Sequence, residues 1–322
     1  MKEKILEFLK QQEGFISGQR ICDELGVSRT AVWKYMNSLK KEGYEIESVT
    51  RKGYRLLQSP DLLTREAVLS CIKKGEIPGE LCCFESIDST NEEAKRRGEA
   101  GAPDGSIYVA DNQTNGKGRR GRTWLSPSGE DIFFTILLRP DLPLNSVSML
   151  TLVAASAVAE AVDKVTGQEC QIKWPNDIMV NGRKLVGILT ELSASMEKID
   201  YIIMGIGINT GMERADFPEA FREGATSFRA EGVHVSRKTL LAAVLSELEK
   251  EYAVAETEGF ARVLDNWRNL SCTLGPNVRV VLGTNSYTGK AVDIDKDGCL
   301  LVDTGNEVNR VIVGDVSIRP AE

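Results

Sequence analysis

GKGRRGRTW (residues 116–124) and KWPND (residues 173–177) are the two stretches from which the fold of this 322-residue chain can be inferred. The first places four cations among three glycines. Glycine has no side chain to block a close approach of the backbone, and arginine guanidinium groups match phosphate or carboxylate oxygens. The stretch therefore predicts a loop that binds an anion, and a plain solvated basic loop is the alternative.

The glycines of this loop also satisfy the G-x-G-x-x-G pattern of dinucleotide-binding folds. That pattern requires a helix immediately after it. The apolar residues 106–110 can form the preceding strand, but residues 124–129 read WLSPSG, with proline and glycine where the helix should begin. The sequence therefore argues against a dinucleotide-binding fold.

The composition predicts a cytoplasmic protein of two or three domains. Hydrophobic residues make up 42 % of the chain, enough for sizeable cores. The most apolar long stretch, residues 147–162, contains serine, threonine and glutamate and is shorter than the roughly 20 residues of a membrane span. It predicts a core helix. The first ten residues, MKEKILEFLK, lack the apolar region of a signal peptide, so we expect no membrane association and no export.

The cysteine and histidine content limits the kinds of catalytic or metal site that the chain is expected to form. The seven cysteines are scattered without a C-x-x-C pair, which indicates reduced thiols. His234 is the only histidine and lies in a polar segment. A Ser-His-Asp triad and a histidine-rich metal site are therefore not expected, and no metal-binding residues are predicted. We therefore expect any chemistry to use lysine, arginine and carboxylate side chains.

Residues 1–60 are predicted to be a winged helix-turn-helix domain. They hold eleven Lys/Arg against eight Asp/Glu, whereas the whole chain has a net charge of −7. Two helices separated by a turn precede a third, which begins after Ser28, and an alternating segment around Arg51 and Lys52 predicts a hairpin. Val32, Met36 and Leu39 share one face of the third helix and should be buried.

The opposite face and the hairpin are predicted to bind DNA, the helix in the major groove and the hairpin on phosphates. A helical cap for protein interaction is the alternative. The predicted DNA-binding residues are Ser28, Arg29, Thr30, Trp33, Lys34, Asn37, Arg51 and Lys52.

Residues 61–273 are predicted to form an α+β domain with an antiparallel or mixed sheet. Residues 131–138, 184–192 and 200–208 have the pattern of strands, and residues 146–166 that of a long helix. KWPND lies at a strand end, and a short hairpin would bring Lys184 into the same cleft. Ser89 and Thr90 begin a helix; they either cap it in Ser/Thr-x-x-Glu boxes or point into a pocket.

Residues 274–322 are predicted to be a small β-barrel. Its short strands are expected at residues 278–282, 290–294, 300–303 and 308–313, with Asp-Gly and Thr-Gly turns between them. Two helices, within residues 240–248 and 260–270, are predicted to precede it.

Taken together, these motifs resemble those of biotin protein ligases. GKGRRGRTW, KWPND, KLVGIL, GIGIN and DSTN occur in the order typical of that family, and the N-terminal segment resembles that of its bifunctional members, which also repress the biotin operon. The resemblance implies a class II synthetase-like central sheet and an SH3-like C-terminal domain near nucleotide and carrier protein. One departure is Lys117, where the family usually has arginine, which puts a bidentate contact there in doubt.

The resemblance also implies the reaction. Biotin and ATP are the substrates, Mg²⁺ arrives with ATP, no cofactor is permanently bound, and biotinyl-5′-AMP passes biotin to a lysine of a biotin carboxyl carrier protein. It further implies adenylate-dependent homodimerisation and binding to operator DNA. The residues implied for biotin are Ser89, Thr90, Asn91, Gln113, Lys117, Gly118, Arg119 and Lys184. Those implied for ATP and the adenylate are Arg119, Arg120, Arg122, Trp124, Lys173, Asn176 and Asn209.

Lys184, Arg119 and Asp177 are the predicted catalytic residues, with Asp177 orienting the incoming amine or a metal-bound water. The alternatives are a biotin-sensing repressor without catalysis and a lipoate-type ligase. A pure sensor has no need of a triphosphate site, and lipoate ligases lack KWPND. We therefore favour the bifunctional ligase.

Overall fold

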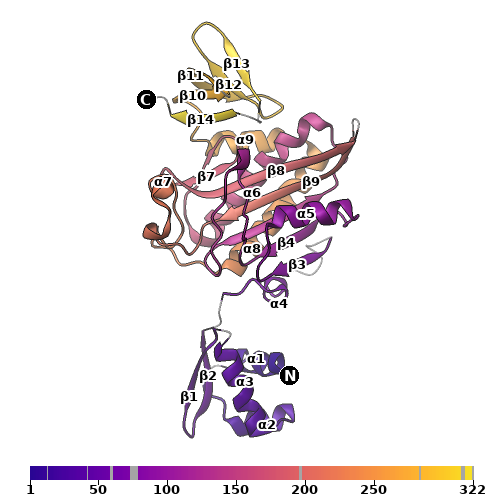
Figure 1. Cartoon of the computed structure of the whole chain (residues 1–322), viewed down its shortest axis with the longest axis vertical. Helices are drawn as coiled ribbons and strands as arrows, with labels where there is room; N and C mark the ends of the chain where they lie inside the picture. Colours follow the sequence, from indigo (N-terminus) through magenta and orange to yellow (C-terminus); the bar gives the residue numbers. More distant parts are fainter. Residues whose placement is uncertain are drawn as a thin grey trace. The chain divides into compact units, whose positions relative to one another are not determined.

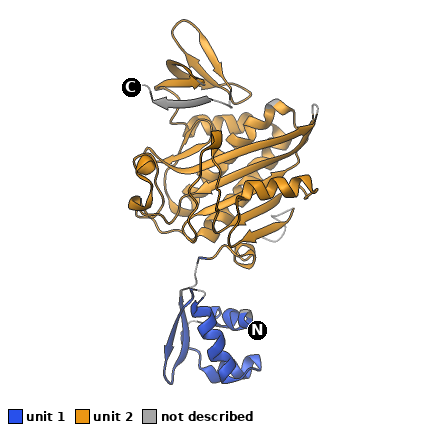
Figure 2. Cartoon of the chain, viewed as in Figure 1, with its two compact units in different colours: residues 1–61 blue, residues 62–322 orange. Residues whose placement is uncertain are grey.

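The computed structural model describes residues 1–12, 14–41, 43–58, 61–72, 79–195, 198–282, 284–312 and 316–320. The chain divides into two compact units, residues 1–61 and 62–322 (Figure 2). The further division of the second unit at residue 273 stays a prediction.

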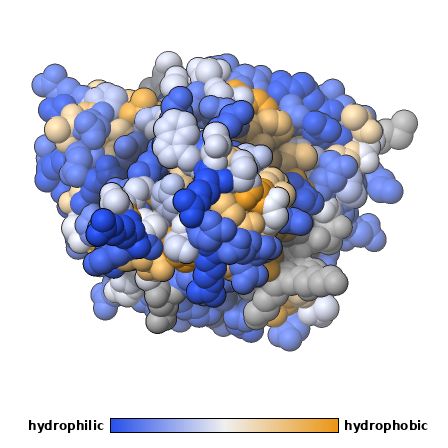
Figure 3. Space-filling model, turned by 90° about the horizontal axis from the view of Figure 1, so that it is seen from below, coloured by the Kyte–Doolittle hydropathy of each residue, from blue (hydrophilic) through white to orange (hydrophobic). Residues whose placement is uncertain are grey.

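Among the described residues, no helix combines the length and apolarity that crossing a membrane requires. The face drawn in Figure 3 is largely hydrophilic, with smaller hydrophobic areas between the hydrophilic residues.

Unit 1 contains the predicted helices and hairpin. Ser17 Oγ accepts a hydrogen bond from the Arg20 N–H at the start of the second helix, and Gly26 ends that helix in the left-handed region at φ 64°. Ser28 Oγ accepts from the Ala31 N–H and so caps the third helix. The elements are α1 (Lys2–Lys10), α2 (Gly18–Leu25), α3 (Arg29–Lys41), β1 (Glu45–Val49) and β2 (Gly53–Gln58).

The prediction that the third helix, α3, is amphipathic is confirmed. Val32, Met36 and Leu39 are each 1 % exposed and join the core of unit 1, whereas Trp33 is 60 % exposed. An i, i+4, i+7 spacing places residues on one face of a helix, so this outcome follows from the sequence alone.

The centre of unit 2 is a seven-stranded mixed sheet (Figure 1). β3 pairs with β4 in parallel and every other neighbouring pair is antiparallel. A parallel pair needs a crossover, and α5 (Thr90–Glu99) lies within it. In spatial order the strands are β3 (Leu81–Phe84), β4 (Ser106–Ala110), β5 (Ile132–Leu138), β9 (Lys198–Ile208), β8 (Arg183–Ser195), β7 (Asp177–Val180) and β6 (Gln171–Lys173).

Helices cover both faces of this sheet. Ile107 and Val109 of β4 belong to the large core that includes the long helices, whereas Tyr108, between them, packs with Ala94 of α5 on the other face. The long helices are α6 (Val147–Thr166), α8 (Arg237–Glu258) and α9 (Ala261–Leu270); the short ones are α4 (Arg65–Leu69) and α7 (Glu219–Arg222), with single 3₁₀ turns at Arg119–Gly121, Leu144–Ser146 and Arg214–Asp216.

The C-terminal strands form a second, wholly antiparallel sheet in the order β13-β12-β11-β10-β14. Their bounds are β10 (Asn277–Leu282), β11 (Asn285–Ile294), β12 (Leu300–Asp303), β13 (Val308–Val311) and β14 (Val316–Pro320). The small β-domain is confirmed, although β14 was not predicted and the described pairings do not join β13 to β14. Residue 313, the predicted end of one strand, lies outside the described residues. Trp174 of KWPND donates its Nε1–H to the carbonyl of Gly298 (3.0 Å) and so attaches this sheet to the central one.

Candidate active site

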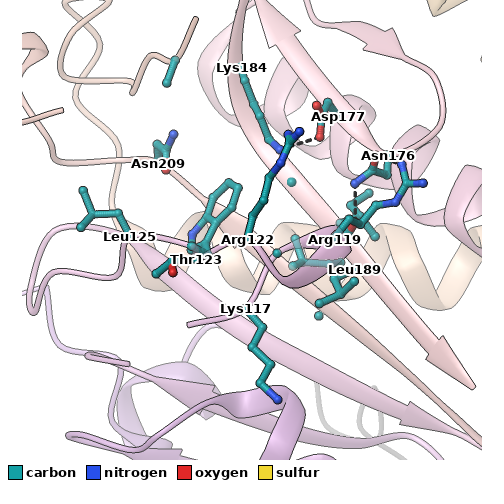
Figure 4. A pocket seen from close by; sticks show the side chains of 18 of the residues that line it. Lys117, Arg119, Arg122, Thr123, Leu125, Asn176, Asp177, Lys184, Leu189 and Asn209 are labelled. Atoms are coloured by element: carbon teal, nitrogen blue, oxygen red, sulfur yellow. Dashed lines mark hydrogen bonds and ion pairs between the residues drawn. The ribbon is translucent and has the colours of Figure 1, made fainter. Parts of the chain in front are cut away.

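A cavity of about 730 Å³ lies over the ends of the central strands (Figure 4). Its walls come from the start of α5, the loop of residues 116–124 (the Gly/Arg loop), the β6–β7 connection and the strands β8 and β9. Every residue that sequence analysis assigned to biotin, the adenylate or catalysis lines it: Ser89, Thr90, Asn91, Gln113, Lys117, Gly118, Arg119, Arg120, Arg122, Trp124, Lys173, Asn176, Asp177, Lys184 and Asn209. Segments more than a hundred residues apart thus form one site.

The floor of the cavity depends on two glycines. Gly187 and Gly207 pair across β8 and β9, and the ring of Trp124 lies on them. A Cβ at either glycine would fall 2.5 Å from a ring carbon, closer than real contacts. The Trp124 Nε1–H is buried, and no acceptor for it lies among the described residues. It can therefore donate to a ligand.

Lys184 and Asp177 form an ion pair inside the cavity, with Nζ 2.6 Å from Oδ1 (Figure 4). They come from neighbouring strands of the β7–β8 hairpin, as predicted. The Lys184 Nζ also lies 5.0 Å from the centroid of the Trp124 ring, within cation–π distance. Asp177 is the only carboxylate among the described lining residues. The described part of the wall is therefore predominantly cationic.

The Gly/Arg loop folds back on itself instead of starting a long helix. The Gly118 N–H donates to the Arg122 carbonyl (2.7 Å), and Arg119–Gly121 makes a single 3₁₀ turn. Arg119 Nη1 donates to Asn176 Oδ1 (2.9 Å), which ties the loop to KWPND. Arg120 has φ 60° and ψ 36°, a left-handed conformation that costs a non-glycine residue about 1–2 kcal/mol. The absence of a following helix agrees with the argument against a dinucleotide-binding fold.

The side chain of Lys117 points away from the other loop cations (Figure 4). Its Nζ lies 2.6 Å from Glu92 Oε1, so the ammonium group of this lining residue is paired with α5. Sequence analysis counted Lys117 among the four cations of the loop and gave no sign of the Glu92 partner, because the two residues are 25 positions apart.

The start of α5 forms the polar end of the cavity. The Thr90 N–H donates to Gln113 Oε1 (2.9 Å), and Thr135 Oγ1 donates to Asn91 Oδ1 (2.7 Å). Asn91 Nδ2 donates to Glu191 Oε2 (2.8 Å). Sequence reasoning missed Thr135 and Glu191, since each lies within a strand and belongs to none of the motifs.

The predicted capping boxes are wrong. Ser89 is the N-cap of α5, but its side chain accepts no helix N–H. Glu92 binds Lys95 and Lys117, and Glu93 binds Arg96 and Arg97, so neither glutamate reaches back to the helix start. The alternative that these hydroxyls face a pocket is the one that fits, because Ser89 and Thr90 line the cavity.

The buried carboxylate of Asp131 binds the backbone that follows Asn209, one of the lining residues. Asp131 Oδ1 accepts the N–H groups of Thr210 (2.6 Å) and Gly211 (3.1 Å), directly after Asn209. Burial raises the pKa of Asp131 to about 6, against an ordinary value of 3.8, despite these hydrogen bonds. Asn209 itself donates from Nδ2 to the Thr226 carbonyl (2.9 Å), which fixes its orientation.

The predicted DNA-binding residues all lie on α3, on its N-cap or in the β1–β2 turn. They are exposed, except that Asn37 is half-buried. Arg29 donates two hydrogen bonds to Gln19 of α2 (3.2 and 2.8 Å), and Lys52 lies 5.8 Å from the centroid of the Phe15 ring. These contacts hold the two cations on the surface of unit 1.

Comparison with known proteins identifies three matching segments. Residues 83–209 match the biotin/lipoate A/B protein ligase family, residues 2–55 an HTH domain and residues 273–319 the biotin protein ligase C-terminal domain. The chain is 38 % identical to the bifunctional ligase/repressor BirA of Bacillus subtilis over 99 % of its length and 98 % of that protein. It is 32 % identical to BirA of Escherichia coli over 99 % of its length and 97 % of that protein.

A solved structure supports the same relationship. The biotin protein ligase of Aquifex aeolicus, in complex with biotin and ATP, aligns with a TM-score of 0.66 and 30 % identity over 75 % of this chain and 99 % of that one. The chain belongs to the biotin protein ligase family, and its full-length relatives are bifunctional ligase/repressors.

Proposed function

We propose that this protein joins biotin to ATP, transfers the biotinyl group to a carrier protein, and represses transcription when it holds the adenylate. The observation that carries the proposal is the cationic cavity lined by Lys184, Arg119 and Trp124, with Lys184 Nζ over the Trp124 ring. Full-length similarity to bifunctional ligase/repressors agrees with it.

In the first step a carboxylate oxygen of biotin attacks the α-phosphorus of ATP. The bond from that phosphorus to the bridging oxygen breaks, and pyrophosphate leaves with the electron pair. Two like charges near 4 Å cost on the order of 4 kcal/mol at an effective dielectric constant of 20. Lys184, Arg119 and the exposed Arg122 can lower this cost by pairing with the anions.

The binding roles follow from the arrangement of the cavity walls. The polar start of α5 and Gln113 suit the ureido ring of biotin, Lys184 and the loop backbone suit its carboxylate, and the floor near Trp124 and Asn209 suits the adenylate. Mg²⁺ would come with ATP, and Asp177, the one carboxylate among the described lining residues, would be the side chain available to hold it.

In the second step a lysine amine of a biotin carboxyl carrier protein attacks the carbonyl carbon of the mixed anhydride. AMP leaves, and the amine loses a proton. Asp177 is the proposed group that orients the amine, because it is the one carboxylate among the described lining residues.

Biotin-dependent pyrophosphate release tests the ligase against both alternatives. Purified protein with ATP and Mg²⁺ should release pyrophosphate when biotin is added and not when lipoate is added. Biotin binding without release would favour a sensor, and release with lipoate alone would favour a lipoate-type ligase.

The repressor function requires a dimer and an operator. We propose that the adenylate orders the cavity loops and so favours a homodimer in the cytoplasm, whose two α3 helices read half-sites that are multiples of about 34 Å apart. Sedimentation equilibrium with and without biotinyl-adenylate tests this coupling. An unchanged dimer dissociation constant would rule it out.

A further inference from the structure

A chain of charged residues joins the beginning of the Gly/Arg loop to the central sheet. Lys117 Nζ lies 2.6 Å from Glu92 Oε1, and Lys95 Nζ lies 3.0 Å from the same oxygen. Lys95 Nζ also lies 2.7 Å from Glu191 Oε1 on β8. Positive and negative groups therefore alternate from the loop, across α5, to the sheet.

The other end of the loop is fixed by neutral groups. Gln113 Nε2 donates to Ser126 Oγ (3.0 Å), and Ser126 Oγ donates to the Trp124 carbonyl (3.2 Å). Gln113 in turn accepts from the Thr90 N–H at the start of α5. Both ends of the loop are thus attached to the same helix, and the Lys117 end is attached by an ion pair.

This ion pair is partly open to water. The side chain of Lys117 is 39 % exposed and that of Glu92 28 %, so the pair can break and reform without unfolding the core. Hydrogen bonding from Lys117, followed by that from Lys95, lowers the pKa of Glu92, which keeps this carboxylate ionised at neutral pH. The attachment is therefore intact under ordinary conditions.

We propose that Glu92 is a positioning residue that acts through Lys117, holding the loop over the cavity and slowing escape of the bound adenylate. Arg119, only two residues beyond Lys117, lines the cavity, so a ligand leaving past the loop has to displace the segment that Glu92 holds. The inference rests on the proposed function and adds a residue outside the cavity lining.

The test is the dissociation rate of labelled biotinyl-adenylate from the full-length protein, formed in place from biotin and α-labelled ATP. A partly exposed pair supports an effect of about fivefold, so Glu92→Gln and Lys117→Met should each release the adenylate about five times faster. The KM for biotin should change less. Lys117→Arg keeps the charge and should stay near the wild-type rate.

Two further readouts separate positioning from loss of structure. The double variant Glu92→Gln with Lys117→Met should release the adenylate no faster than either single variant, because both substitutions remove the same ion pair. The wild-type advantage over Glu92→Gln should also shrink as KCl is raised, because salt screens exposed pairs. Glu160→Gln is the matched control, since Glu160 pairs with Lys164 at the same 2.6 Å on α6, outside the cavity lining.

Each outcome bears on a different claim. Equal release rates for wild type and Glu92→Gln, or additive effects of the two substitutions in the double variant, would overturn the positioning role and leave the ligase function standing. Failure of the wild-type protein to form any adenylate would overturn the ligase function, and this inference with it.

Discussion

Gly187 and Gly207 lie opposite each other on β8 and β9, and the missing side chains leave the space that the Trp124 ring occupies. The contact explains why the KLVGIL and GIGIN segments each carry glycine within an otherwise apolar strand. Glycine weakens a strand, so its presence at two paired positions indicates a close approach by another group. That group is the ring that forms the floor of the cavity.

Replacing Gly207 by alanine should displace the ring. The new Cβ would fall 2.5 Å from Trp124 Cε2, and overpacking of this kind costs about 1–3 kcal/mol. We expect weaker ATP binding and a changed Trp124 fluorescence. Gly224→Ala is the control, because its nearest neighbour would be 3.9 Å away. Equal loss of ATP affinity in both variants would contradict the role of the floor.

Arg120 should be less costly to replace by glycine than Arg122. Arg120 has φ 60°, whereas Arg122 has φ −73° and ψ 150°. Relief of the left-handed strain should make Arg120→Gly more stable than Arg122→Gly by about 1–2 kcal/mol. Denaturant unfolding of the two variants measures this difference, and a lower stability for Arg120→Gly would refute it.

Asp177→Asn should slow the transfer step. The substitution removes the ionised partner of Lys184 and the only carboxylate among the described lining residues. Loss of a group that orients a proton-bearing nucleophile costs about 100-fold or more. Single-turnover transfer to a carrier protein, started from preformed adenylate, measures it. If the rates of both half-reactions were unaffected, Asp177 would have no chemical role.

Asp131 should make stability depend on pH. Its pKa is about 6 in the folded protein against an ordinary 3.8, so the folded state holds this proton more tightly. The resulting stabilisation is complete below about pH 3.8 and is lost as the pH rises through 6. The unfolding free energy of wild type relative to Asp131→Asn should therefore fall by about 2 kcal/mol between pH 4 and 7. A constant difference across that range would contradict this.

Much of the fold could be predicted because it follows from local periodicity. The buried face of α3, the long helix α6 and the strands β5, β8 and β9 all follow from apolar spacing along a continuous segment. β14 was missed because its short segment carries proline and arginine, which make a weak strand pattern. The register of the sheets also depends on pairings between distant segments, which a single sequence does not contain.

In the site too, residues that belong to local motifs could be predicted, whereas contacts between distant residues could not. Motif residues such as Lys184 and Asn176 were predicted to meet in one pocket, and they do. One of the two interpretations of the start of α5 placed Glu92 in a capping box, because its spacing from Ser89 is ideal, yet Lys117 and Lys95 bind it instead. A local spacing rule failed there because charged partners from elsewhere in the chain offered stronger contacts.

The most direct test of the ligase assignment is formation of biotinyl-adenylate without a carrier protein. The protein would be incubated with biotin, Mg²⁺ and α-labelled ATP, and retained label would be measured after gel filtration. We predict retained biotinyl-adenylate for wild type and for Lys198→Ala, an exposed lysine at the start of β9, and a loss of at least about 100-fold for Lys184→Ala. Biotin binding with no adenylate in the wild-type protein would contradict the assignment.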